Sequence, residues 1–143
     1  HTAIMISRVL VPMDDSEMAE HALTFALEAY PSADITVLHI VGEPSSMMGK
    51  AAGLALQDDV EEAAEELASE VLQRARDIAE TYDRSIGTDV HMGTPAKVIV
   101  KRAEEYDTVV IGSHGGSLVE RLFVGNVAED VFRQSPVPVT VVR

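Results

Sequence analysis

The residues most able to do chemistry form a glycine-rich segment between positions 112 and 126. It contains Gly112, Gly115 and Gly125, and it ends at Asn126. An apolar run typical of a buried strand precedes it, and an amphipathic run typical of a helix follows it. Backbone N–H groups in such a strand-to-helix turn can point together at an anion. The spacing therefore indicates a phosphate-binding site, although glycines that serve only the turns would give the same pattern.

Two other phosphate-binding motifs do not fit this segment. A Walker A loop has a lysine directly after its second glycine, and no lysine occurs beyond position 101. A dinucleotide fingerprint would occupy the first strand-to-helix turn, and residues 12–16 contain no glycine. Asn126 and Glu129 instead have the spacing of a capping box, and Ser117 and Glu120 repeat it. We expect a short helix followed by a second helix that begins at Asn126, with both N-termini free to hold a polyphosphate.

Side chains that could catalyse a reaction are scarce around this segment. Asp14 and Asp15 follow the first apolar run, as in a phosphorelay receiver domain, but the aspartate after the third strand and the lysine after the fifth are absent. Capping a helix is the simpler role for Asp15.

His114 can approach a phosphate or make only a hydrogen bond within the loop. No histidines share a metal-ligand spacing, so we expect no protein metal site. No serine has visible histidine and aspartate partners. We expect a protein that holds a polyphosphate with little or no ability to hydrolyse it.

Five apolar runs alternate with four amphipathic runs and would position these residues. The apolar runs predict strands at 8–12, 35–41, 85–91, 107–111 and 137–142. The amphipathic runs predict helices between Ser16 and Pro31 and at 57–82, 95–106 and 127–134, with a loop over 42–53. Thr94 is the expected N-cap of the third helix, with Pro95 at its first position. This alternation predicts an α/β fold, with a parallel sheet and helices on both faces. If the first and fourth strands are neighbours, Pro12–Asp14 and the segment from Gly112 onward meet at their carboxyl ends.

The chain has 143 residues and a formal net charge of −13. This length fits a single domain, which we expect at 5–143, with residues 1–4 as additions ahead of a start at Met5. The negative charge disfavours nucleic acid and anionic membranes as partners. The absence of cysteine excludes disulfides and is typical of a reducing cytoplasm, where we expect the protein to act. The acidity fits an ordinary acidic protein or one adapted to the salt-rich cytoplasm of an archaeon.

The C-terminal run can form an interface between two copies of the chain. Val137, Val139 and Val141 lie in an apolar strand that we expect at one edge of the sheet, and such edges can pair. A twofold contact would give a homodimer. The alternative is an edge blunted by Pro136 and Pro138.

Several short motifs together resemble one known family. They are Pro12-Met13-Asp14, Leu38-His39-Ile40, Gly93-Thr94-Pro95, Gly112-Ser113-His114-Gly115 with Gly125-Asn126, and the run 136–142. In this combination the chain resembles a universal stress protein of the ATP-binding branch, essentially from Ser7 to Arg143. The resemblance implies a five-stranded Rossmann-like sheet, of the adenine nucleotide alpha-hydrolase-like type, in the order 3-2-1-4-5. It also implies a stress-response regulator that forms a homodimer through its last strands.

The resemblance further implies a set of nucleotide-binding residues. An aspartate after the first strand, here Asp14, contacts the nucleoside, and the backbone near Ile40 binds adenine. The full implied set is Pro12, Met13, Asp14, Ile40, Ile111, Gly112, Ser113, His114, Gly115, Gly125, Asn126, Val127 and Ala128. Asn126 replaces the usual serine or threonine, so ATP, ADP and AMP all stay open as ligands, with Mg²⁺ held only through the phosphates. A nucleotide-free protein-interaction module and a slow ATP hydrolase are the alternative functions.

Overall fold

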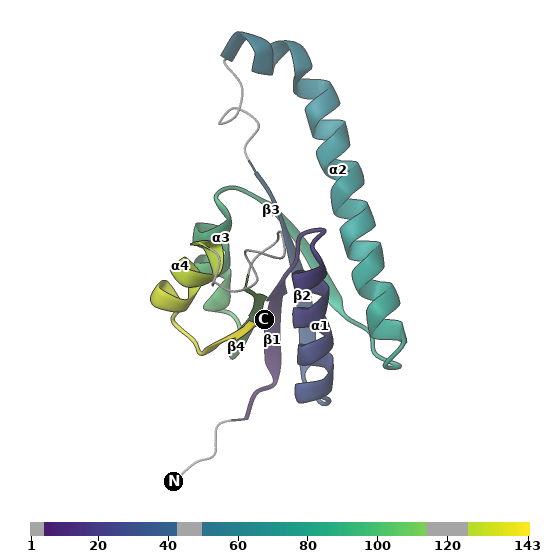
Figure 1. Ribbon diagram of the computed structural model, residues 1–143, viewed down its shortest axis with the longest axis vertical. Helices are drawn as coiled ribbons and strands as arrows, with labels where there is room; N and C mark the ends of the chain where they lie inside the picture. Colours follow the sequence, from purple (N-terminus) through teal and green to yellow (C-terminus); the bar gives the residue numbers. More distant parts are fainter. Residues whose placement is uncertain (1–4, 43–49, 114–125) are drawn as a thin grey trace.

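The computed structural model describes residues 5–42, 50–113 and 126–143, with residues 50–60 described by their backbone alone. Residues 1–4, 43–49 and 114–125 lie outside the described residues. Strands and helices alternate along the described chain (Figure 1). They are β1 (Arg8–Pro12), α1 (Glu17–Ala29), β2 (Asp34–Val41), α2 (Lys50–Glu80), β3 (Gly87–Met92), α3 (Pro95–Ala103), β4 (Thr108–Gly112), α4 (Asn126–Gln134) and β5 (Val139–Val142).

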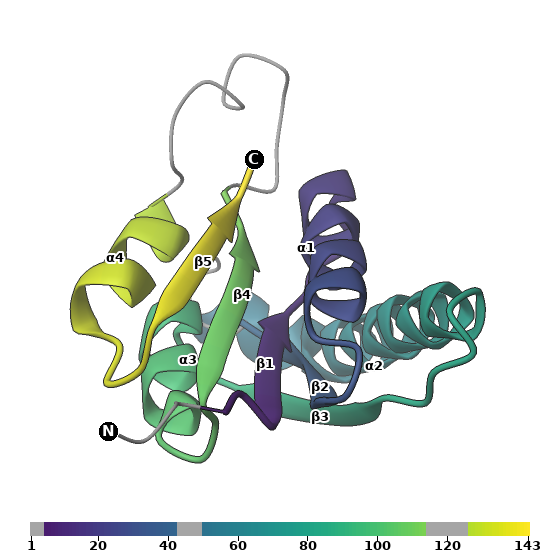
Figure 2. The ribbon, with the colours of Figure 1, turned by 90° about the horizontal axis from the view of Figure 1, so that it is seen from below.

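These strands form one parallel sheet in the order β3-β2-β1-β4-β5. The central strand β1 pairs with β2 on one side, where Val9 lies opposite Ile35, and with β4 on the other, where Val9 lies opposite Thr108. Helices α1 and α2 cover one face of the sheet, and α3 and α4 cover the other (Figure 2). The predicted fold and strand order are therefore confirmed. The strand order reverses between β1 and β4, and ligands bind at such a point in open α/β sheets.

The sheet separates two apolar cores, which explains why its central strands are apolar at nearly every position. Val9, Val11 and Val37 belong to the core under α1 and α2. Leu10 and Leu38, one position along, belong to the core under α3 and α4. Successive side chains of a strand point to opposite faces, so both sets are buried. The same alternation decides which residues of each strand can reach a site on one face.

Several predicted boundaries are wrong, among them the ends of α2 and α3, which lie at Glu80 and Ala103 instead of residues 82 and 106. The helix α2 begins at Lys50 instead of residue 57, so the predicted loop over 42–53 is too long. Residues 51–57 are mainly Ala, Leu and Gln, whose helix propensity outweighs the cost of Gly53. Strand β3 is confirmed as an edge but begins at Gly87 instead of residue 85. Strand β5 begins at Val139 instead of residue 137, just after Pro138, which has no N–H to donate to a ladder.

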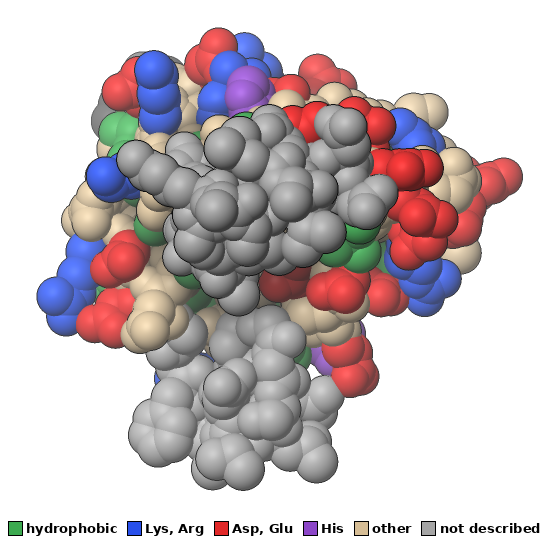
Figure 3. Space-filling view, turned by 90° about the horizontal axis from the view of Figure 1, so that it is seen from above, with side chains coloured by type: hydrophobic (Ala, Val, Ile, Leu, Met, Phe, Trp, Pro, Cys, Tyr) green, Lys and Arg blue, Asp and Glu red, His purple; other side chains and the backbone are tan. Residues whose placement is uncertain are grey.

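The surface charge of α2 matches its sequence pattern. Glu61, Glu62, Glu65, Glu66 and Glu70 are all exposed. Acidic side chains gather along the side of the molecule on which α2 lies (Figure 3). These carboxylates account for part of the net charge of −13 and are consistent with a solvated helix face.

Asp107 connects the start of β1 to the start of β4. Its Oδ2 accepts hydrogen bonds from the backbone N–H groups of Ser7 and Arg8, both at 2.9 Å, and from the Ser7 hydroxyl at 3.0 Å. The Asp107 N–H donates in return to the Arg8 carbonyl at 2.9 Å. Hydrogen bonds from Ser7 and Arg8 stabilise the ionised carboxylate and therefore lower the pKa of Asp107.

We expect Asp107→Asn to destabilise the protein at neutral pH and to have a smaller effect in acid. The folded-state pKa of Asp107 is depressed, so its contribution to stability is present above the unfolded-state pKa of about 3.9. That contribution is lost as the pH falls through the folded-state value. Urea unfolding of both proteins at pH 7 and pH 3 checks this. A difference in unfolding free energy that is the same at both pH values would contradict it.

Candidate functional site

A cavity of about 270 Å³ opens at the carboxyl ends of β1 and β4, where the strand order reverses. The structure brings together all ten of the predicted nucleotide-binding residues that it describes. They all line this cavity and are Pro12, Met13, Asp14, Ile40, Ile111, Gly112, Ser113, Asn126, Val127 and Ala128. The other three, His114, Gly115 and Gly125, lie outside the described residues, as do Ser117, Glu120 and the short helix predicted there.

The first wall of the cavity is the turn between β1 and α1. The Met13 N–H donates to the Leu38 carbonyl at 2.8 Å and so extends the pairing of β1 with β2 by one residue. Asp14 Oδ1 accepts from the Ser16 N–H at 2.9 Å, and Ser16 Oγ accepts from the Ala19 N–H at 3.1 Å. Ser16, and not Asp15, is therefore the N-cap of α1. These bonds fix the backbone that presents Asp14.

The second wall is the end of β4, and here the structure changes the interpretation of a glycine. A Cβ atom placed on Gly112 would lie 2.8 Å from the carbonyl oxygen of Met18 and 2.9 Å from its carbonyl carbon. The close packing of α1 on β4 therefore requires glycine at this position, whatever binds in the cavity. The next residue, Ser113, is fully buried and donates its N–H to the Val142 carbonyl at 2.8 Å. Within the described chain, the Ser113 hydroxyl has no hydrogen-bond partner.

The third wall is the first turn of α4, which contributes Asn126, Val127 and Ala128. The helix begins at Asn126, so this residue occupies the first helical position instead of the predicted cap. The first backbone N–H groups of a helix have no partner within it, and they carry the positive end of the helix dipole. Glu129, predicted to complete a capping box, pairs with Arg133 at 2.8 Å. The cavity thus has one wall that favours a negatively charged group.

The chain matches one known protein family. A family model described as the universal stress protein family matches residues 5–143. The chain belongs to the universal stress protein family. Universal stress protein MJ0577 of Methanocaldococcus jannaschii is 30% identical over 159 aligned positions, which cover 99% of this chain and 97% of that relative. The resemblance drawn from the short motifs is therefore confirmed.

Solved universal stress proteins share the fold. The UspA protein of Lactobacillus plantarum superposes with a TM-score of 0.81 at 24% identity, over 99% of this chain and 100% of that one. A universal stress protein solved in complex with cAMP superposes with a TM-score of 0.70 at 25% identity, over 96% of this chain and 97% of that one.

Five further residues line the cavity and were not predicted. They are Ser16, Ala19, Leu38, Pro95 and Ile99. Leu38 is two residues before Ile40 on β2, and strand periodicity could have identified it. Pro95 and Ile99 lie on α3. The helical pattern of apolar residues in the sequence did not show that this face of the helix borders a cavity. The cavity floor is thus apolar, which suits a planar ring system better than a polyanion.

Asp14 is the only charged side chain among the described residues that line the cavity. None of those lining residues is a lysine or arginine that could neutralise several phosphates. Within residues 5–42, 50–113 and 126–143, no group of three or more histidine and carboxylate side chains could hold a metal ion. The described walls can therefore bind an apolar ring and a phosphate by shape, backbone amides and a helix dipole.

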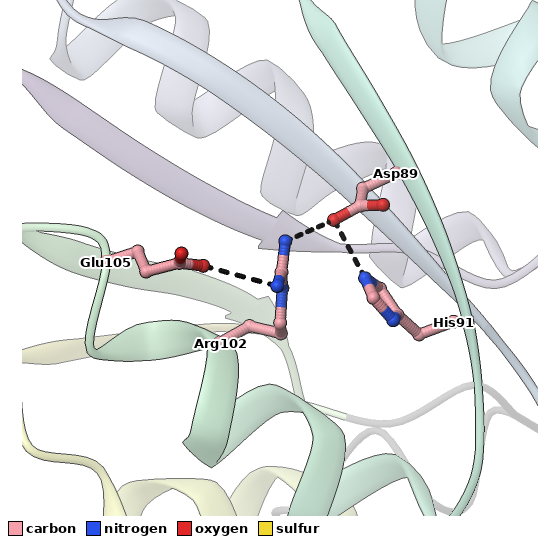
Figure 4. A network of polar contacts seen from close by, with 4 residues as sticks. All are labelled: Asp89, His91, Arg102 and Glu105. Atoms are coloured by element: carbon pink, nitrogen blue, oxygen red, sulfur yellow. Dashed lines mark hydrogen bonds and ion pairs between the residues drawn. The ribbon is translucent and has the colours of Figure 1, made fainter.

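A charged cluster between β3 and α3 is a separate feature (Figure 4). The Arg102 guanidinium lies 2.7 Å from Asp89 Oδ2 and 3.3 Å from Glu105 Oε2, and His91 Nε2 lies 3.0 Å from the same Asp89 oxygen. None of these residues lines the cavity. The guanidinium lies between the two carboxylates and would repel a metal ion there. The cluster ties the edge strand to α3.

In the described part of the chain, no helix combines the length and the apolar character needed to cross a bilayer.

Proposed function

We propose that this universal stress protein binds an adenine nucleotide in the cavity between β1, β4 and α4. The observation that carries the proposal is that ten residues, which the family resemblance implies as nucleotide-binding, line one cavity at the topological switch point. The related protein solved with cAMP has the same fold and supports an adenine-containing ligand.

In this proposal each wall holds a different part of the ligand. The apolar floor formed by Leu38, Ile40 and Ile99 holds the adenine ring. The free oxygen of Asp14 accepts from a ribose hydroxyl, because its Oδ1 is already bonded to Ser16. The first turn of α4 holds the phosphate nearest the sugar through its N–H groups and dipole. The fully buried Ser113 hydroxyl offers one further hydrogen bond.

We further propose that the protein is a regulator that holds its nucleotide and hydrolyses it slowly or not at all. Phosphoryl transfer requires charge neutralisation and a positioned nucleophile. The described cavity walls supply one carboxylate, which already accepts a hydrogen bond, and no cation. A bound nucleotide can then report the state of the cytoplasm to a protein partner during stress.

The titration that tests the proposal uses stripped protein. The purified protein is denatured, its supernatant is analysed for nucleotides by anion exchange, and the refolded protein is titrated with ATP, ADP, AMP and cAMP, with and without Mg²⁺. We expect at least one adenine nucleotide to bind with a Kd below about 100 μM, equivalent to a binding free energy of about −5.5 kcal/mol. No binding at millimolar concentrations would favour an interaction module, and turnover at about 1 s⁻¹ or faster would indicate an enzyme.

We also propose a homodimer formed through the outer edge of β5. The Pro138 carbonyl accepts a hydrogen bond from Val109 of β4, and the Val142 carbonyl accepts one from Ser113, just after β4. By strand periodicity the backbone groups of Val139 and Val141 therefore point to the other side. Within the described chain β5 ends the sheet, and these groups are free to pair with a second copy. Light scattering at micromolar concentration should give twice the chain mass, and a monomer mass would contradict the dimer.

A further inference from the structure

A buried histidine lies directly behind the cavity. His39 belongs to β2, and only 4% of its surface is exposed. Its Nδ1 is 2.9 Å from the carbonyl oxygen of Met13. A carbonyl oxygen can only accept, so Nδ1 carries the proton and donates it. The ring is therefore fixed in one tautomer by a backbone group of the turn that forms the first cavity wall.

His39 cannot touch a ligand in the cavity. Its neighbours Leu38 and Ile40 both line the cavity, whereas His39 does not. Side chains alternate between the two faces of a strand, so the imidazole points to the face covered by α1 and α2. Val37, two residues earlier on the same face, belongs to the core on that side. Any effect of His39 on the ligand must act through the turn.

Hydrogen bonds at Asp14 and Ser16 hold the α1 side of this turn, whereas its Met13 side is held by β2. Pro12 has no N–H, and Met13 is the last residue before the exposed pair Asp14 and Asp15. Both backbone groups of Met13 bind β2, because its N–H donates to the Leu38 carbonyl and its carbonyl accepts from His39. Two consecutive residues of β2 thus fix the peptide units on either side of Met13. The second of these units leads directly to Asp14.

We propose that His39 is a positioning residue that holds the Met13–Asp14 peptide in the orientation that binds the nucleotide. The proposal rests on the proposed adenine-nucleotide function. An apolar side chain would fill the same core space, but it would leave the Met13 carbonyl without its donor and free the turn to rotate. This hydrogen bond accounts for a buried histidine on a face of β2 where the preceding side chain, Val37, belongs to a hydrophobic core.

Two substitutions separate the hydrogen bond from the packing. His39→Asn places its amide nitrogen at the position of Nδ1 and keeps the donor, whereas His39→Leu keeps the bulk and removes the donor. We expect the Kd of the best adenine nucleotide to rise about 10-fold in His39→Leu, which is about 1.4 kcal/mol, and less than about 3-fold in His39→Asn. Ile78→Ala is the control, because it destabilises the same core far from the turn. A Kd in His39→Leu no higher than in Ile78→Ala would overturn the proposal.

A second readout needs no ligand and separates this proposal from the proposed function. Nitrogen-15 spectra of the folded wild-type protein should show His39 protonated at Nδ1, and a proton on Nε2 alone would overturn the proposal. Amide hydrogen exchange at Met13 and Ser16 should be faster in His39→Leu than in His39→Asn. If the wild-type protein binds no adenine nucleotide but shows this tautomer and exchange pattern, the proposed function fails and the positioning role stands. Equal exchange in both variants would refute the positioning role.

Discussion

Replacement of Gly112 by alanine is expected to lower the free energy of unfolding by about 2–3 kcal/mol, a large effect for one added methyl group. The added Cβ would lie 2.8 Å from the Met18 carbonyl oxygen and 3.2 Å from the Ala19 backbone nitrogen. Both atoms belong to the backbone of α1 and cannot move aside as a flexible side chain would. Either α1 or β4 must therefore shift, and each is packed in a core. Urea unfolding at pH 7 measures the loss.

Gly42 provides the matched control for this prediction. It lies just beyond β2, and a Cβ atom placed on it meets nothing within 4 Å. Gly42→Ala should therefore leave stability unchanged or raise it slightly, since alanine restricts the unfolded chain. Equal losses in both variants would mean that the contact with α1 is not the reason for glycine at position 112. A shift of α1 would also move Ser16 and Asp14, so Gly112→Ala should weaken nucleotide binding as well.

The fold could be predicted from the sequence because the deciding signals are local or repetitive. Strands 8–12 and 108–112 are apolar at almost every position, since both their faces are buried. The start of α3 was predicted from Thr94 and Pro95, a cap and a residue suited to the first helical position. Errors in the predicted boundaries occurred where the competing local preferences are weak. One example is the start of α2 at Lys50, where several good helix formers surround a glycine.

The site could be predicted only in part, because its walls come from elements far apart in the sequence. The motif residues of β1, β4 and α4 were identified, and the structure places them around one cavity. Pro95 and Ile99 were missed because nothing in a helical repeat shows which of its apolar residues face a cavity instead of a core. The contact of Gly112 with Met18 was missed for a related reason. Where the backbones of a strand and a helix come close together, the glycine is the only trace of the contact in the sequence.

Ile40→Trp is expected to weaken adenine-nucleotide binding at least 100-fold, or by about 2.7 kcal/mol. Ile40 is half-buried at the carboxyl end of β2 and lines the cavity, so an indole there occupies the space proposed for the adenine ring. The fold should survive, because the ring can grow into a cavity of about 270 Å³ without displacing core side chains. Calorimetric titration measures the affinity, and circular dichroism checks the fold.

Val90→Trp is the matched control, since Val90 lies on the neighbouring strand, is 44% exposed and does not line the cavity. It should bind as the wild type does, and wild-type affinity in Ile40→Trp would place the nucleotide elsewhere.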